Sequence, residues 1–417
     1  MTLKGEIMGK NTNAMEIEHV PTKNKYEKVQ FISWEVHTGP YIHGQGVGLY
    51  TGLRSETNDL RTDALGQCKD IDARVAFTDE ALKLAFAGSD PSPKTLKVFM
   101  APEFLYRGAG GAYLFDLLDG WKSAPADLGL PPPYNGPWPG LFVKLRNLIA
   151  KKDYEHWIVV FGTAVGASFD TVDSNGIRQL DLAKASVVYN CALVQRGGAT
   201  KEEREDTHIA RKHFKSPIDF FNWIGAALQH GGNVEHFDPR TKRVTDTNDM
   251  SEGSALFNFG SVGDRDGRRL EFGIEICLDH CASAVSNNFG RIRAAGEYVN
   301  IQLVPSAGMN LWPESVRLLP ANKATPTSYA FNCDGLSQQI NTAGSHTQIW
   351  SRVDSGAAAQ FHELVNANGG SLRPGRLLPM LHRVPTIHGL VTADLLWNNQ
   401  AGVQGAGCVR VMDALPI

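Results

Sequence analysis

The chain has 417 residues, of which 42% are hydrophobic and 20% charged, a composition that excludes a largely disordered or fibrous protein. Its formal net charge of −3 lacks the basic excess that favours nucleic acid. Residues 1–24 lack the apolar core of a signal peptide, and no apolar run approaches the length of a membrane span. Six cysteines are too few for a disulfide framework in a chain of this length. We therefore expect a cytoplasmic protein with neither a nucleic-acid nor a membrane partner.

The first half of the chain predicts strands that alternate with helices. Short apolar runs at 29–34, 96–101 and 157–162 indicate buried strands. Apolar residues at helical spacing over 63–87 and 141–149 indicate the helices between them. The resulting order, β-α-β-α-β, is typical of layered α/β folds.

The second half predicts further strands and one helix. The strand at 185–194 has a candidate partner around 208–212, and 256–259 with 270–277 predict a hairpin. A helix around 292–295 and strands at 299–306, 347–350 and 386–392 follow. Since there is no repeat or clear linker, we expect one domain over 25–400, with an N-terminal extension (1–24) and a C-terminal tail (401–417).

Three chemically complementary side chains lie at or just beyond predicted strand ends: Glu103, Lys212 and Cys277. Such ends can converge on one crevice of a sheet, where ligands tend to bind. A carboxylate can accept the proton of a thiol, and the thiolate can then attack a carbonyl or nitrile carbon. An ammonium group and a backbone N–H, here that of Leu278, can stabilise the oxyanion that forms.

Each of these residues also has a simpler interpretation. A free cysteine after a strand is more often an inert core residue. Glu103 can be a helix-capping or surface carboxylate, and Lys212 belongs to a basic run, 211–215, that can simply be solvated. A metal site at Cys277 and Cys281 is weakly indicated, because no second ligand cluster accompanies that spacing.

Taken together, the motifs resemble the nitrilase superfamily of carbon–nitrogen hydrolases. The similarity runs from about 29 to 396 and includes Pro102-Glu103, Arg211-Lys212-His213 and Cys277-Leu278-Asp279, with supporting matches at 161–163, 189–190 and 304–307. The resemblance implies a Glu-Lys-Cys triad on an α/β fold, a four-layer α-β-β-α sandwich. It also implies a second glutamate between the lysine and the cysteine. Glu235 and Glu252 both qualify, and we favour Glu235 because Glu252-Gly253 is typical of a turn.

The departures from the family pattern bear on the substrate. Nitrile-cleaving members follow the cysteine with Trp-Glu, whereas Leu278-Asp279 is closer to the amidase and carbamoylase pattern. His280 and Cys281 replace a turn that is common in the family, so an unusual pocket wall is expected. As substrate contacts the sequence suggests Tyr106, Asp279, His280 and Ser306.

Two insertions, 104–139 and 216–248, carry aromatic residues that could form a wall over the site, or could merely pack the insertions down. The expected activity is hydrolysis of a small carboxamide or N-carbamoyl substrate through a Cys277 thioester, without metal or cofactor. Nitrile hydrolysis, acyl transfer and a catalytically silent scaffold are the alternatives. The resemblance further implies a homodimer or higher homo-oligomer.

Overall fold

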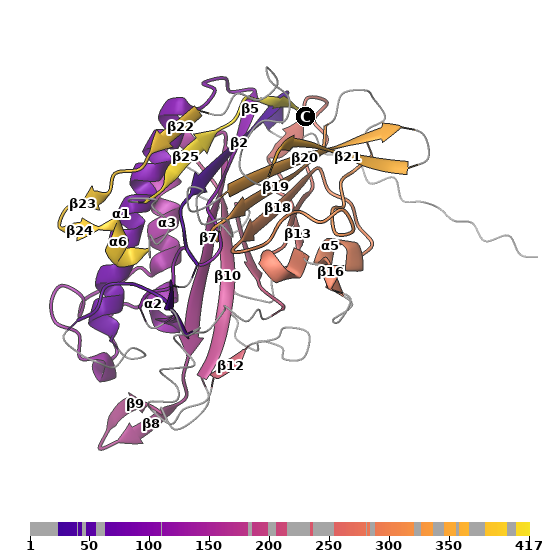
Figure 1. Ribbon diagram of the computed structural model, residues 1–417. Helices are drawn as coiled ribbons and strands as arrows, with labels where there is room; N and C mark the ends of the chain where they lie inside the picture. Colours follow the sequence, from indigo (N-terminus) through magenta and orange to yellow (C-terminus); the bar gives the residue numbers. More distant parts are fainter. Residues whose placement is uncertain are drawn as a thin grey trace, which may run out of the picture.

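The computed structural model describes residues 24–39, 41–43, 47–55, 63–109, 111–181, 186–198, 206–214, 234–236, 254–280, 282–283, 288–320, 327–336, 346–355, 358–366, 380–397 and 406–417. These residues form an α/β protein with two large sheets and few helices (Figure 1). None of the helices described is long and apolar enough to cross a membrane.

The first sheet has a parallel centre with antiparallel additions. Strand β2 pairs parallel with β5, and β5 pairs parallel with β7, while β10 and β11 extend one side antiparallel. The path runs β11 (Thr207–Arg211), β10 (Ser186–Arg196), β7 (Trp157–Ser168), β5 (Thr95–Met100), β2 (Lys28–Glu35), β25 (Cys408–Val411) and β22 (Met380–Arg383). Three short strands attach to it: β6 (Tyr113–Leu114), β12 (Val234–His236) and β26 (Leu415–Pro416).

The second sheet also has a parallel core, β15-β18-β19, followed by antiparallel strands. Its order is β13 (Leu256–Phe257), β15 (Phe272–Ile274), β18 (Ile301–Ser306), β19 (Tyr329–Asp334), β20 (His346–Ser355) and β21 (Ala358–Val365). The two sheets face one another across a buried apolar layer, in which the Phe31 and Phe331 ring centroids are 5.0 Å apart. Parallel strands in both sheets therefore bring their carboxyl ends to the edge of this shared interface.

Helices cover the other face of the first sheet (Figure 1). The long helix α1 (Ala64–Gly88) begins at Asp63, whose side chain accepts a hydrogen bond from the Gly66 amide. It packs with α2 (Phe115–Asp119) and α3 (Leu141–Ile149) in one apolar core. On the outer face of the second sheet, the described residues supply the four-residue helix α5 (Arg291–Ala294) and the irregular segment 307–320.

The remaining elements are short. They are β1 (Asn24–Tyr26) paired with β14 (Val262–Asp264), β3 (Tyr41–His43) with β4 (Val47–Leu49), β8 (Thr171–Ser174) with β9 (Ile177–Leu180), β16 (Ala282–Ser283) with β17 (Asn288–Phe289), β23 (Ile387–His388) with β24 (Val391–Thr392), helix α6 (Ala393–Leu396), and the 3-10 turns η1 (Ala126–Leu128), η2 (Lys152–Tyr154) and η3 (Cys277–His280).

The sequence-based elements of the first half are confirmed, and so is the pairing of β10 with β11. Two expectations were wrong. The single strand expected at 386–392 is a small hairpin, because Gly389 turns the chain at a positive φ of 59°. The strand expected over 270–277 ends at Ile274, so the chain has already left the sheet before it reaches Cys277.

The centre of the first sheet joins parts of the chain that are distant in sequence. Strand β2 lies between β5 and β25, and Arg410 of β25 holds Glu35 of β2 through two hydrogen bonds of 2.6 and 2.9 Å. Trp34 donates its indole N–H to the carbonyl oxygen of Ala406. The sheet is therefore complete only when both regions are present.

Candidate active site

Glu103 and Lys212 form a buried ion pair. Glu103 follows β5 and Lys212 follows β11, and the Lys212 Nζ lies 2.8 Å from the Glu103 Oε1 with both side chains 0% exposed. Asn190 of β10 forms hydrogen bonds with both Glu103 and Lys212. Its side-chain amide donates to the same Glu103 oxygen at 2.8 Å, and its carbonyl accepts a hydrogen bond from the Lys212 backbone N–H at 2.8 Å.

Cys277 lies on a strained turn just beyond β15. It opens the 3-10 turn η3 with a φ of 47°, and its thiol is buried and directed at the Ala307 carbonyl oxygen, 3.8 Å away. Among the described non-glycine residues, positive φ values occur only at Cys277, Phe104 and Asn175. Asparagine adopts this conformation readily, whereas cysteine and phenylalanine rarely do. The strained positions are thus Cys277 and the residue next to Glu103, as is common at functional sites.

The end of β18 connects Cys277 to Glu103. The Ser306 carbonyl accepts a hydrogen bond from the Glu103 backbone N–H at 3.2 Å, and the next residue, Ala307, supplies the carbonyl that faces the thiol. One short piece of backbone therefore contacts both the carboxylate-bearing residue and the cysteine.

Asp279 connects the cysteine turn to the lysine. Its carboxylate accepts hydrogen bonds from the backbone N–H groups of His213 and Phe214, at 3.0 and 2.9 Å, directly after Lys212. Burial raises the pKa of Asp279 to about 7, against the opposing effects of the Arg291 charge and of these backbone donors. The expected substrate contact of Asp279 stays a prediction, and both of its carboxylate oxygens accept backbone hydrogen bonds within the protein.

His280 is also held inside the protein. Its Nε2 accepts a hydrogen bond from the Trp312 backbone N–H at 3.1 Å, so Nδ1 carries the proton and donates to Glu275 at 2.6 Å. Glu275 further accepts from Gln302 and from the Ile292 backbone. Both ring nitrogens of His280 thus bond to the protein and anchor the turn that carries Cys277, and the expected substrate contact stays a prediction.

Ser306 and Tyr106, the other expected substrate contacts, both form hydrogen bonds within the protein. Both are buried, and the Ser306 hydroxyl accepts a hydrogen bond from Asn332 at 3.0 Å. The Tyr106 hydroxyl lies 2.6 Å from the Thr78 hydroxyl of α1, within the core on the helical face of the first sheet.

Of the two candidates for the second glutamate, the structure describes the backbone of Glu235 alone. The backbone of Glu235 lies in β12 beside Val187 of β10, and its side chain lies outside what the structure describes. Glu252 lies outside the described residues, as does the insertion 216–248 apart from 234–236. Leu278 lies in η3 directly after Cys277.

The aromatic residues of the insertion 104–139 mostly pack against helices. Trp121 stacks on Trp138 with a 6.0 Å centroid separation, the Trp138 ring contacts Lys144 of α3, and the Tyr134 hydroxyl bonds Asp72 of α1. The expectation of an aromatic wall over the site is therefore replaced, for these residues, by the simpler alternative of packing.

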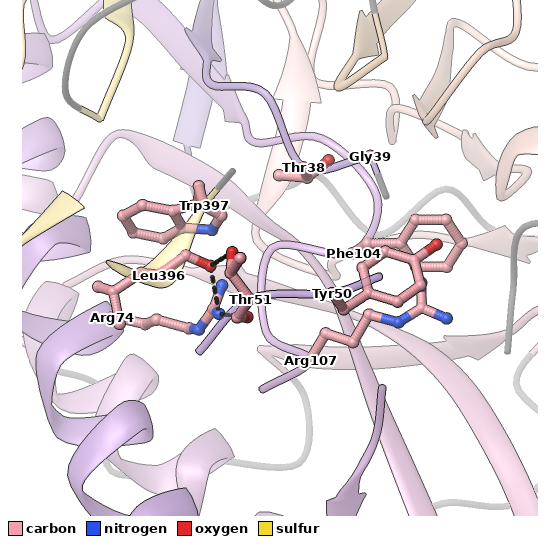
Figure 2. Close-up of a pocket in the computed structure, with 9 residues that line it drawn as sticks. All are labelled: Thr38, Gly39, Tyr50, Thr51, Arg74, Phe104, Arg107, Leu396 and Trp397. Atoms are coloured by element: carbon pink, nitrogen blue, oxygen red, sulfur yellow. Dashed lines mark hydrogen bonds between the residues drawn. The ribbon is translucent and has the colours of Figure 1, made fainter. Parts of the chain in front are cut away.

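A small cavity is lined by residues near Glu103 in the fold, although not by Glu103 itself, and is shown in Figure 2. Phe104 lines it, Thr38 of its wall donates a hydrogen bond to the Glu103 carbonyl, and the Arg107 guanidinium lies over the Tyr50 ring at 3.4 Å from the centroid. Its volume of about 10 Å³ leaves room for one water molecule at most. The lining residues are Thr38, Gly39, Tyr50, Thr51, Arg74, Phe104, Arg107, Leu396 and Trp397.

Sequence reasoning missed two buried acids, Glu275 and Asp334, and noted Asn190 only as a motif match. Asp334 ends β19 just as Ser306 ends β18, so the signal was available: a polar residue that follows an apolar strand. Within the described ranges no cluster of three His, Cys, Asp or Glu side chains could hold a metal ion, and Cys281 lies outside them.

Comparison of the sequence with models of known protein families gives no match, and a search of curated proteins gives none either.

Proposed function

We propose that this protein hydrolyses a non-peptide carbon–nitrogen bond, in a small carboxamide or N-carbamoyl compound, through a thioester on Cys277. The observation that carries the proposal is the fully buried Glu103–Lys212 pair, with Nζ and Oε1 2.8 Å apart, whose two members are joined by short backbone links to a strained cysteine turn. Burying two charges is costly, and structural stability alone seldom requires it. A site that must move a proton and stabilise an oxyanion does require both charges.

The reaction follows from these groups. Glu103 takes the proton of the Cys277 thiol, and the sulfur attacks the carbonyl carbon. The Lys212 ammonium and the Leu278 backbone N–H stabilise the oxyanion. Protonated Glu103 then gives its proton to the departing ammonia or amine, which leaves a thioester. Glu103 next deprotonates water, the hydroxide attacks the thioester, and the acid is released with the thiol restored.

We further propose the finer fold and assembly that accompany this chemistry. The fold is compatible with an α-β-β-α sandwich of the carbon–nitrogen hydrolase type. Its layers are the helices on the first sheet, the two facing sheets, and α5 with the segment 307–320 on the outer face of the second sheet. A homodimer or higher homo-oligomer in the cytoplasm is the corresponding assembly. Glu235 is the proposed second glutamate, and Leu278-Asp279 in place of Trp-Glu favours amides over nitriles.

The test is ammonia release from a panel of carboxamides, N-carbamoyl compounds and nitriles. We expect turnover of at least one amide-type compound, its loss in Cys277→Ala, and its retention in Cys408→Ala, a partly exposed free thiol outside the site. Intact-mass measurement of the wild-type protein, acid-quenched during turnover, is expected to show an acyl adduct on Cys277. Undiminished turnover by Cys277→Ala would refute the mechanism, and no turnover of any compound would favour a silent scaffold.

A further inference from the structure

Asp334 is a buried acid that the proposed mechanism does not use. It ends β19 beside Ser306, the last residue of β18, and is 1% exposed. Its Oδ1 accepts hydrogen bonds from the backbone N–H groups of Gly308, at 2.5 Å, and Leu336, at 3.1 Å. The carboxyl group thus links the segment that follows β18 to the segment that follows β19 through hydrogen bonds.

The segment that Asp334 holds is the one that contacts both Glu103 and the cysteine. Gly308 directly follows Ala307, whose carbonyl oxygen faces the Cys277 thiol at 3.8 Å. Ser306 precedes Ala307, and its carbonyl oxygen accepts the hydrogen bond from the Glu103 backbone N–H. The Ser306 carbonyl also accepts the Gly335 N–H at 2.8 Å, from the residue next to Asp334. A shift of Gly308 would therefore move the two carbonyls that orient the thiol and the base.

Asp334 is also electrostatically close to the catalytic base. Burial is the largest cause that raises the pKa of Asp334 to about 7, the Gly308 and Leu336 donors oppose it, and the charge of Glu103 raises it further. This effect is consistent with the hydrogen bonds that the Ser306 carbonyl accepts from Glu103 and Gly335. Near neutral pH Asp334 is therefore partly protonated.

We propose that Asp334 is a positioning residue, which fixes the loop 306–308 so that the Ala307 carbonyl orients the Cys277 thiol and the Ser306 carbonyl orients Glu103. The inference rests on the proposed function for its effect on turnover. Its effect on the thiol can be measured without any substrate. What positions the loop is the acceptor oxygen of Asp334, so an amide at this position should serve almost as well as a carboxyl.

The experiment measures the rate of alkylation of Cys277 by iodoacetamide, followed peptide by peptide by mass spectrometry on the full chain. Asp334→Ala is expected to slow this rate by roughly tenfold or more, because loss of the fixed geometry disorders the thiol and its base. Asp334→Asn keeps the acceptor and should stay close to the wild type. Asp63→Ala is the matched control, since Asp63 is likewise buried and caps backbone N–H groups, those of Gly66 and Ser55, at the start of α1.

Normal alkylation of a folded Asp334→Ala protein would overturn the inference, as would an Asp334→Asn protein as slow as Asp334→Ala. Equal slowing by Asp63→Ala would also overturn it, because the effect would then reflect general destabilisation. If an amide substrate is found, Asp334→Ala should lower kcat with little change in KM. Slow alkylation in a protein that hydrolyses nothing would sustain the positioning role while refuting the proposed function.

Discussion

Replacement of Lys212 by methionine is expected to destabilise the protein strongly. At 2.8 Å, and with an effective dielectric constant of about 20, the attraction between the Lys212 and Glu103 charges is about 6 kcal/mol. Most of this attraction offsets the desolvation of the two charges. Removing the lysine leaves the Glu103 carboxylate buried without its cation, so the free energy of unfolding should fall by about 3–5 kcal/mol.

The assay is equilibrium unfolding in urea, in which the midpoint should fall at an unchanged slope. Lys94→Met supplies the control, because Lys94 and Glu27 form an ion pair whose side chains are 64% and 52% exposed. That pair should contribute about 1 kcal/mol at most. The double variant Glu103→Gln/Lys212→Met should recover much of the lost stability, since no unpaired charge then remains. Equal midpoints for Lys212→Met and Lys94→Met, or a double variant less stable than Lys212→Met, would contradict the reasoning.

Three further predictions concern neighbouring residues. Because folding raises the pKa of Asp279 from 3.8 to about 7, the folded state binds more protons than the unfolded state between these values. The free energy of unfolding should therefore fall as pH rises through that window, by about 4 kcal/mol at about 1.4 kcal/mol per pKa unit. Asp279→Asn should remove this pH-dependent change from the free energy of unfolding measured in urea. An unchanged pH profile in Asp279→Asn would contradict the prediction. Cys277→Gly should be more stable than Cys277→Ala by about 1 kcal/mol in thermal unfolding, because only glycine adopts a φ of 47° freely, and the reverse order would exclude strain at this position. Asn190→Leu should lower the free energy of unfolding by about 1–3 kcal/mol, because the hydrogen bond to Glu103 is lost. Asn258→Leu, at an exposed site, should leave the urea midpoint nearly unchanged. Equal losses in the two variants would contradict the role of Asn190 as a partner of Glu103.

The apolar runs of the sequence predicted the strands well, because buried parallel strands are nearly continuously hydrophobic. They predicted strand ends less well. The run through Ile276 remains apolar after the sheet has ended, since Ile276 packs in the core between the sheets although it lies outside a strand. A pattern of hydrophobicity reports burial, and it cannot distinguish a strand from a buried turn.

The meeting of Glu103 with Lys212 was foreseeable from their places at strand ends, whereas the roles of their neighbours were not. His280 and Asp279 follow the cysteine closely in sequence, and their partners include the Glu275 carboxylate and backbone groups of Trp312, His213 and Phe214. Such pairings depend on how two sheets are placed against each other. No local property of the sequence encodes that placement.

The position of β2 between β5 and β25 has a consequence for synthesis of the protein. Glu35 and Arg410 are 375 residues apart, and at roughly 5–20 residues per second the ribosome needs about 20 to 75 s to pass from one to the other. During that time β2 has a neighbour on one side at most, and its other edge offers unpaired backbone groups to any passing strand. Recovery of soluble protein from cells should therefore depend on how well this edge is shielded until Cys408–Val411 emerges.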